Sequence, residues 1–445
     1  MKFNSFIMLG ISLLLVNSLE AQQKTSLKLE EAIHLAWKNS NETTLADTKV
    51  NTKALELKAT KNHVYPDLKV SGQYQRLTNA SVNLNQKSNS SSGTSSESAP
   101  AVNQLMLGQV NASIPIFNGF KLKNSIKAAD NLYQAQTANA LQTKEDVAMK
   151  VVDYYARLYK AKKTVELITE NKKSAQQRVT DFIDLEKNGI IPRNDLLKAQ
   201  LQLSKLQLSL DSAISDLNTV NYELVTFLKL ESKTNLDVLE SDFANFQMDN
   251  IPTSERVALD NRKDLEAIRL EEKAILDQVK IAKSGYYPSL SIIGGYTTLD
   301  LKNLVTVQNA INFGVGVSYD LSGILKNGTN VKVAQSKAEE IKQQEAILTD
   351  KIKIDVQSAI EQYDLSLKQG SVYTQAVEQA TENYRILKDK YDNGLADTND
   401  LLEADVEQLE AKINQTLSKA NSIQKYYALL SVSGQLNQTF NLSKI

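Results

Sequence analysis

The sequence contains no cysteine, and this absence excludes several classes of protein at once. Disulfide frameworks, thiolate metal sites, iron–sulfur clusters and cysteine nucleophiles all need that side chain. Histidine is scarce as well, with only His34 and His63. Lysine plus arginine (51) and aspartate plus glutamate (52) cancel to a formal charge of -1, so no basic field supports nucleic-acid binding. The chain also lacks a glycine-rich phosphate loop and a nucleophile constellation, so we expect no enzyme, no cofactor and no metal site.

Long apolar runs are missing too, apart from one at the start of the chain. Residues 1–21 have the pattern of a secretory signal: Lys2, an apolar run over residues 6–16 and a cleavage site after Ala21. A short membrane anchor is the alternative, but the run falls short of the roughly 20 residues that a spanning helix needs. We therefore expect an exported protein that can cross a membrane only with strands.

The scarcity of proline is informative because of where the six prolines lie. None occurs between Pro115 and Pro192 or after Pro288, and proline-free stretches favour long helices. We predict helices over residues 120–187 and 330–392, each about 100 Å long at a rise of about 1.5 Å per residue. The helix that returns after the first has an apolar residue every seven positions; these are Leu196, Leu203, Leu210, Leu217 and Leu224. This seam predicts a coiled coil, and Val406, Ile413, Ala420 and Tyr427 repeat it in the second half.

The chain consists of two copies of one plan. Tyr65-Pro66 and Tyr287-Pro288 are separated by 222 residues, and Asn188-Gly189 and Asn393-Gly394 by 205. A Ser-rich insertion, residues 86–99, occurs only in the first copy. The predicted organisation is a signal peptide (1–21), a first repeat (22–230), a linker (231–252), a second repeat (253–435) and a tail (436–445).

Four short segments alternate apolar with polar or small residues, and we predict them as strands over residues 67–76, 109–117, 289–299 and 311–321. Lengths near ten residues suit tilted membrane strands with an apolar outer face, although an ordinary antiparallel sheet on a core has the same pattern. Four strands cannot close a barrel, because the smallest filled barrels need about eight. Each chain must then share its strands with copies of itself, and the pattern alone does not choose between two copies and three.

The motifs in these positions resemble those of the TolC-type outer membrane efflux proteins, also called outer membrane factors. The matching segments are Leu29-Glu30-Glu31-Ala32-Ile33, Tyr286-Tyr287-Pro288-Ser289-Leu290, and the tight turns at Gly189 and Gly394 with the segments that follow. The resemblance covers essentially the whole mature chain. It implies a mainly α protein whose homotrimer closes a twelve-stranded β-barrel in the outer membrane of a Gram-negative bacterium. Long coiled-coil helices would continue this barrel as a periplasmic tunnel, with residues 231–252 and the C-terminus forming an equatorial belt.

The two tight turns hold the candidate site residues. Gly189 and Gly394 suit a positive φ that ends each long helix, and Asn194 or Asp195, and Asn399 or Asp400, could cap the returning helices. The resemblance implies a carboxylate gate formed by Asp195, Asp400 and Glu403, which would favour cations. It also implies adaptor docking at the tips, through Asn188, Gly189, Leu196, Leu197, Asn393, Gly394, Leu401 and Leu402. An arginine that family members use to lock the tip is replaced by Ala396.

The resulting prediction is a passive efflux duct of a tripartite system. The resemblance implies a periplasmic adaptor (a membrane fusion protein) and an inner-membrane pump of the RND or ABC type, which must supply the energy. One alternative in the same fold is the outer component of a type I protein secretion system. Another, of a different class, is a periplasmic coiled-coil structural protein without a pore.

Overall fold

The computed structural model describes residues 24–78, 102–239, 243, 254–302 and 304–440. The predicted signal peptide, the Ser-rich insertion and most of the predicted linker lie outside the described residues. In chain order the elements are β1 (Lys24–Leu27), α1 (Leu29–Asn39), α2 (Asn41–Asn62), β2 (Asp67–Arg76), β3 (Gln104–Asn118), α3 (Lys121–Lys187), α4 (Arg193–Phe227), β4 (Asn235–Val238), α6 (Glu255–Asn261), α7 (Lys263–Lys283), the 3-10 turn η1 (Ser284–Tyr286), β5 (Ser289–Leu301), β6 (Val305–Ser318), α8 (Leu321–Asp392), α9 (Thr398–Val432) and α10 (Leu436–Thr439). None of the helices in this part of the chain has an apolar stretch long enough to cross a membrane.

The chain forms two compact units, and each unit contains segments of both repeats. The first, which we call the tip unit, takes its described residues from 1–47, 139–263 and 348–445. The second, the strand unit, takes them from 48–138 and 264–347. The long helices α3 and α8 run through both units. The units are therefore defined by which residues pack together, whereas the repeats are defined by their order along the chain.

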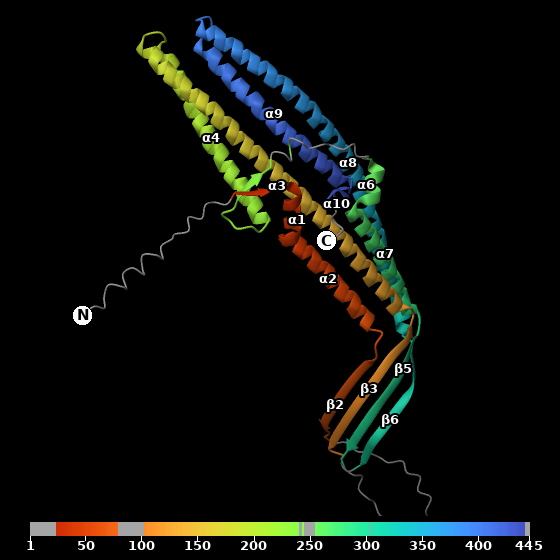
Figure 1. Ribbon diagram of the computed structural model, residues 1–445. Helices are drawn as coiled ribbons and strands as arrows, with labels where there is room; N and C mark the ends of the chain where they lie inside the picture. Colours follow the sequence, from red (N-terminus) through yellow and green to blue (C-terminus); the bar gives the residue numbers. More distant parts are fainter. Residues whose placement is uncertain (1–23, 79–101, 240–242, 244–253, 303, 441–445) are drawn as a thin grey trace, which may run out of the picture. The chain divides into compact units, whose positions relative to one another are not determined.

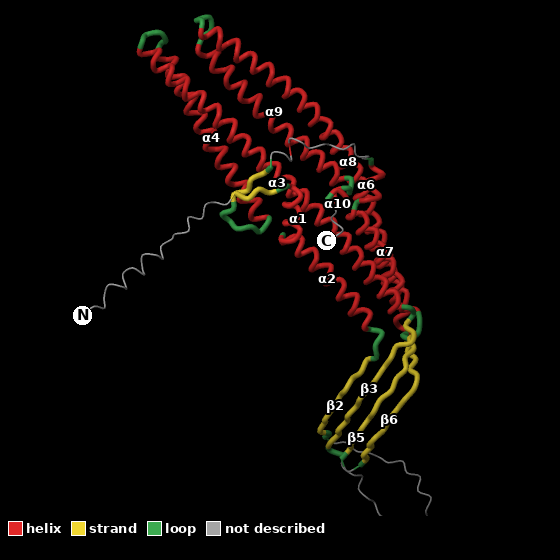
Figure 2. The backbone as a smooth tube through the Cα atoms, viewed as in Figure 1, coloured by secondary structure: helices red, strands yellow, loops and turns green. Residues whose placement is uncertain are grey.

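The strand unit contains a four-stranded sheet in the order β2-β3-β5-β6, in which every neighbouring pair is antiparallel (Figure 2). β2 has the predicted bounds, whereas β3 begins five residues earlier than predicted and β5 ends two residues later. The prediction for β6 was wrong, because this strand covers Val305–Ser318 and not 311–321. Asp320 explains the difference: its carboxylate accepts hydrogen bonds from the Gly323 amide (2.9 Å) and the Ser322 hydroxyl (2.8 Å). Such an acceptor starts a helix, and α8 begins at Leu321 rather than near residue 330.

The tip unit contains two helical hairpins, α3 with α4 and α8 with α9, whose turns lie at the same end of the unit (Figure 1). The predicted seam of α4 is confirmed, since Leu196, Leu210 and Leu224 are buried. In α9 the prediction is partly wrong, because Val406 is 40% exposed and its neighbour Asp405 is buried. The main core lies where α1, α3, α4 and α9 meet, and its large buried side chains include Ile33, Tyr155, Leu224 and Leu430.

A small parallel sheet joins the start of the described chain to the segment after α4. β1 pairs with β4, so that Leu27 lies beside Val238. The Tyr155 hydroxyl donates to the Leu27 carbonyl at 2.8 Å, and Lys162 forms an ion pair with Asp237. Leu436 of α10 is fully buried in the same core. Segments of the predicted equatorial belt therefore pack around the helices of the tip unit.

Candidate functional site

Both hairpin turns have the same backbone geometry, and glycine makes it accessible. α3 ends at Lys187, and Gly189 follows with φ +72°. The Gly189 amide donates to the Glu186 carbonyl and the Ile190 amide to the Leu185 carbonyl, both at 2.9 Å. These two bonds satisfy carbonyls that the helix end leaves free, in the pattern of a Schellman motif. Gly394, with φ +73°, repeats the pattern after α8.

The predicted capping residues are wrong at both returning helices. α4 begins at Arg193 after Pro192, which makes no side-chain cap, so Asn194 and Asp195 lie inside the first turn. α9 is capped by Asp397, whose carboxylate accepts from the Asp400 amide at 3.0 Å. Each helix starts a residue or two before the predicted caps. The carboxylate of Asp400 is therefore not required for capping, although negative charge in a first turn suits the helix dipole.

Of the three predicted gate carboxylates, Asp195 and Asp400 lie in the first turns of α4 and α9, and Glu403 lies one turn further along α9. Asp400 and Glu403 are exposed on α9. Asp195 is half-buried on α4 and lies 3.3 Å from the Lys198 ammonium. A single chain thus presents carboxylates at the tip without assembling them into a ring.

The predicted docking residues differ strongly in exposure. Leu196 and Leu401 are buried in the chain itself, whereas Leu197 is 51% exposed and Leu402 is half-buried. Asn188 and Asn393 are exposed, and each amide group donates to a carbonyl of its own helix at 2.7 Å. The surface that a partner could contact therefore includes Leu197 and the exposed turn residues, while Leu196 packs in one cluster with Val179 and Phe182 of α3 and Leu401 is buried.

Sequence reasoning missed two apolar residues at the outermost points of the turns. Ile190 is 67% exposed and Leu395 is 78% exposed. Each directly follows the positive-φ glycine, at the position whose amide closes the wider hydrogen-bonded ring of the turn. The signal was present in the sequence, since an apolar residue after a Gly C-cap commonly makes a contact. Here the side chains are left exposed, which makes the two tips apolar at their ends.

A buried polar cluster connects all four long helices of the tip unit, and it too was missed. The Arg178 guanidinium on α3 donates to the Asp405 carboxylate on α9 at 3.0 Å and to the Tyr384 hydroxyl on α8 at 3.3 Å. Gln202 on α4 donates to the Leu402 carbonyl at 3.3 Å and to Asp405 at 3.4 Å. Only 10% of the Arg178 side chain and 4% of the Asp405 side chain are exposed.

The charge of Arg178 is compensated within this cluster. Burial by itself would lower the pKa of Arg178, but the hydrogen bond and charge of Asp405 outweigh burial, and the pKa is raised. An ion pair in this setting holds its partners in place, because removing one partner leaves the other charged and buried. The cluster therefore ties the α3–α4 hairpin to the α8–α9 hairpin.

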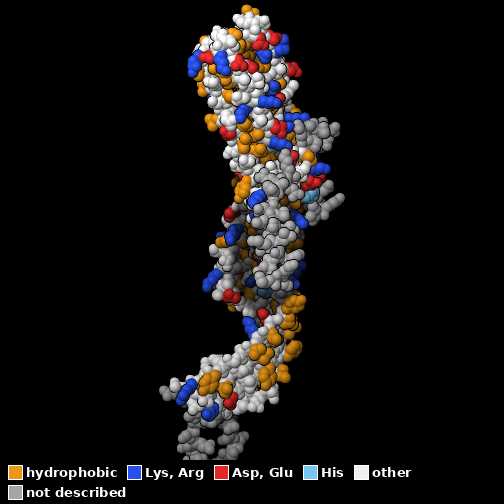
Figure 3. All heavy atoms as spheres, turned by 60° about the vertical axis from the view of Figure 1, so that its left-hand side comes forward, with side chains coloured by type: hydrophobic (Ala, Val, Ile, Leu, Met, Phe, Trp, Pro, Cys, Tyr) orange, Lys and Arg blue, Asp and Glu red, His pale blue; other side chains and the backbone are white. Residues whose placement is uncertain are grey.

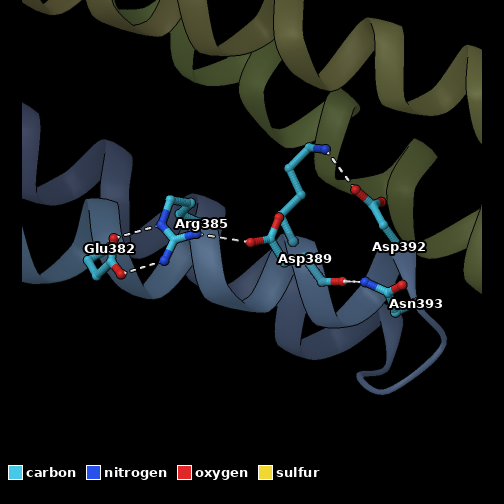
Figure 4. Close-up of polar contacts among 6 residues, drawn as sticks. Glu382, Arg385, Asp389, Asp392 and Asn393 are labelled. Carbon is cyan, nitrogen blue, oxygen red and sulfur yellow. Dashed lines mark hydrogen bonds and ion pairs between the residues drawn. The ribbon is translucent and has the colours of Figure 1, made fainter.

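The end of α8 carries a ladder of exposed ion pairs next to the second turn (Figure 4). Arg385 donates to the Glu382 carboxylate at 2.7 and 2.8 Å and to Asp389 at 3.0 Å. Lys388 pairs with Asp392 at 2.9 Å. The hydrogen bond from Arg385 lowers the pKa of Glu382 and raises the pKa of Arg385. Exposed pairs add little to stability, so the ladder mainly sets which charges the tip presents to solvent.

In the strand unit, the two outer strands of the sheet have no neighbour on one side within the described chain. Their apolar side chains are among the most exposed in the molecule: Leu68, Val70 and Tyr74 on β2, and Ile311, Phe313, Val315 and Val317 on β6. Figure 3 shows hydrophobic side chains exposed along the strands. Unpaired strand edges invite pairing with another chain, and such exposed apolar area suits a lipid or protein surface.

Neither unit shows a metal site, because no three histidine or acidic side chains of the described residues come close enough together to hold an ion.

Comparison with known proteins agrees with these features. The model of the outer membrane efflux protein family matches residues 33–226 and 256–435. Among solved structures, the chain is similar to the outer membrane protein VceC of Vibrio cholerae (TM-score 0.75, 16% identity, covering 91% of this chain and 96% of that one). It is also similar to the outer membrane channel CmeC of Campylobacter jejuni (TM-score 0.76, 17% identity, 94% and 88% covered) and to the open state of the MtrE channel of Neisseria gonorrhoeae (0.74, 16%, 92% and 89%). No curated protein matches the chain by sequence.

The family match covers both repeats and therefore includes the strands, the long helices and the two turns. The chain belongs to the outer membrane efflux protein family and acts in the outer membrane as an efflux channel.

Proposed function

We propose that three copies of this chain close a twelve-stranded barrel in the outer membrane and continue it as a helical tunnel through the periplasm. The observation that carries the proposal is the sheet with open edges at β2 and β6, whose exposed side chains are apolar. Hydrocarbon does not tolerate unpaired backbone groups, each of which costs several kcal/mol. Pairing β6 of one copy with β2 of the next removes both edges.

The channel itself is passive and performs no catalysis. A periplasmic adaptor docks on the hairpin tips, and an inner-membrane pump of the RND or ABC type supplies the energy. The exposed surface of the tips supports this assignment, because Ile190, Leu197 and Leu395 offer apolar contacts beside the exposed asparagines. Cation selectivity comes from Asp195, Asp400 and Glu403, which three-fold symmetry would bring around one axis.

The test of the channel is purification of the full chain from outer membranes, followed by gel electrophoresis with and without heating and by planar-bilayer recording. We expect heat-modifiable trimers that conduct ions with a preference for cations. The double variant Asp400→Asn/Glu403→Gln should keep the trimer and lose most of this preference. A chain that stays monomeric without detergent would contradict the proposal, and unchanged selectivity in the double variant would remove the gate assignment.

The outer component of a type I protein secretion system would use the same fold, so a second role in protein secretion can be tested alongside efflux. Deletion of the protein distinguishes them. Lost tolerance to small toxic compounds with normal protein secretion supports efflux, and the converse supports secretion. Crosslinked pull-down of the native complex would identify the adaptor and the pump.

A further inference from the structure

The two faces of the sheet can be told apart by their residues. We call a row of residues paired across neighbouring strands a rung. On one face, one rung runs from Lys69 of β2 through Asn111 of β3 and Gly295 of β5 to Asn312 of β6. The next rung carries Ser71, Gln109 and Thr297. The opposite face carries the exposed apolar side chains described above. A lysine and two asparagines do not face hydrocarbon, so the polar face is the one that lines the lumen in the proposed barrel.

The last two rungs of this polar face, at the end of the strands away from the helices, depart from the pattern. One rung pairs Leu107 with Leu299 and Leu299 with Val307, and the other pairs Leu105 with Leu301 and Leu301 with Val305. The pairing of β3 with β5 is uninterrupted through these rungs. The leucines are half-buried, and the two valines are 36% and 38% exposed. Six aliphatic side chains therefore share the face that deeper in the sheet is polar apart from Ile293 of β5.

A β-bulge keeps the aliphatic side chains of β6 in phase with those of β5. The register of the β5–β6 pair shifts between Thr297 and Leu299, where β6 contributes one extra residue and Asn309 has φ +59°. Without the extra residue, Val305 and Val307 would change faces, because side chains alternate along a strand. The bulge thus places these two valines on the lumen face beside Leu301 and Leu299.

We propose that Leu105, Leu107, Leu299, Leu301, Val305 and Val307 form an apolar collar inside the outer mouth of the channel, where amphipathic organic solutes bind weakly as they leave. The inference rests on the proposed trimeric barrel, in which three copies of the collar face one another around the lumen. β2 contributes Gln73 and Gln75 to the same rungs, so the collar is interrupted once per copy.

The size of the barrel decides what the collar does. Barrels of about eight strands are filled by side chains, and barrels of about sixteen to eighteen hold an aqueous channel. A twelve-stranded lumen lies between these limits, so water and small ions pass, while a solute with an alkyl or aromatic part can contact the wall. Apolar contact is non-directional and grows with the area removed from water. Such a wall favours amphipathic solutes as a class and specifies no single compound.

The test is block of single channels by decyltrimethylammonium, with tetramethylammonium as the control cation that has the same head group and no chain. We expect decyltrimethylammonium to block the wild-type channel for resolvable times and tetramethylammonium to block only weakly. The variant Leu107→Ser/Leu299→Ser should shorten the decyltrimethylammonium block about tenfold, because the chain loses apolar contact on all three copies. The variant Gln73→Leu, which fills the gap in one rung, should lengthen it.

Several outcomes would overturn the collar. One is a set of conducting trimers in which neither variant changes the duration of decyltrimethylammonium block. Another is a serine variant with unchanged block and a lower melting temperature, which would show that the leucines only support the sheet. Gln73→Leu removes no packing, so it tests the idea even where the serine variant fails to assemble. A wild-type chain that forms no channel would instead overturn the proposed function on which the collar rests.

Discussion

Glycine serves two different purposes in this chain, and the surroundings of each residue distinguish them. At Gly189 and Gly394 the backbone has a positive φ, but a Cβ atom added there would meet nothing within 4 Å. At Gly119 φ is also positive, at +63°, and an added Cβ would lie 2.6 Å from the Ser284 carbonyl oxygen. The tips therefore need glycine for its conformation alone, whereas the junction between β3 and α3 also needs its small size.

We expect Gly189→Ala to lower the free energy of unfolding by about 1 kcal/mol, the cost of a left-handed conformation for an alanine. Gly119→Ala should cost about 2 to 4 kcal/mol, because close contact with the carbonyl adds to the same strain. Thermal unfolding of the purified protein, followed by circular dichroism, compares the two. Equal losses in the two variants would show that contact with Ser284 has no energetic effect.

Asp397 and Asp400 lie three residues apart at the start of α9, and their roles can be separated. The carboxylate of Asp397 accepts from the Asp400 amide, whereas the carboxylate of Asp400 is exposed. We expect Asp397→Ala to lower the free energy of unfolding by about 1 kcal/mol through loss of the cap. Asp400→Asn keeps the shape of the side chain and should leave stability nearly unchanged while it reduces cation selectivity. If Asp400→Asn proves the more destabilising of the two, the assignment of the cap is wrong.

At the scale of helices, the buried cluster around Arg178 connects the two hairpins. Arg178→Ala should destabilise the tip unit by about 3 to 5 kcal/mol, because it leaves Asp405 charged and buried. The matched variant Arg178→Met/Asp405→Leu removes both charges and should recover most of this loss.

Spin labels on Asn188→Cys and Asn393→Cys, introduced into the cysteine-free chain, report the distance between the tips. We expect a longer and broader distance distribution in Arg178→Ala than in the double variant. Identical distributions in all three proteins would show that the cluster does not hold the hairpins together.

The elements of the fold could be predicted where periodicity fixes them. Heptad spacing located the α4 seam, and alternation together with Tyr65-Pro66 located β2. Boundaries failed where one side chain decides, as at Asp320, which ends the β6 segment and starts α8. The polar cluster could not be predicted either, because the burial of Asp405 depends on the packing of four helices. A period of about 3.5 residues gives a seam, but it does not show which neighbouring position a second hairpin covers.

The aliphatic rungs at the end of the sheet could not be predicted for a similar reason. Leu299 was predicted at the very end of its strand, and Val305 and Val307 fell outside the predicted strand of residues 311–321. Their shared face depends on the bulge opposite Thr298, which adds a residue to one strand. Alternation in a single segment cannot show such an insertion, because it appears only when two strands are paired.

At the scale of the whole molecule, the absence of cysteine becomes an experimental advantage. No thiol of the native chain can form a background disulfide, so any covalent link between copies must come from the residues introduced. A disulfide also requires Cα atoms about 4.4 to 6.8 Å apart. Crosslinking therefore measures which residues of two copies are true neighbours across the proposed seam between β6 and β2.

We expect oxidation to link Val70→Cys to a second cysteine on β6 of a neighbouring copy. The second cysteine should be scanned over Ile311, Phe313, Val315 and Val317, which lie on the same apolar face as Val70. Closing a barrel staggers neighbouring strands, so we expect one or two of the four positions to react and the others to stay reduced. Covalent trimers should then resist heating in detergent until a reducing agent is added.

Cysteines on the polar face of β6, at Gly314 or Gly316, serve as matched controls, because they point away from Val70 and should not react. Links within one chain, or none at any position, would show that the open edges of this sheet are not completed by copies of the same chain.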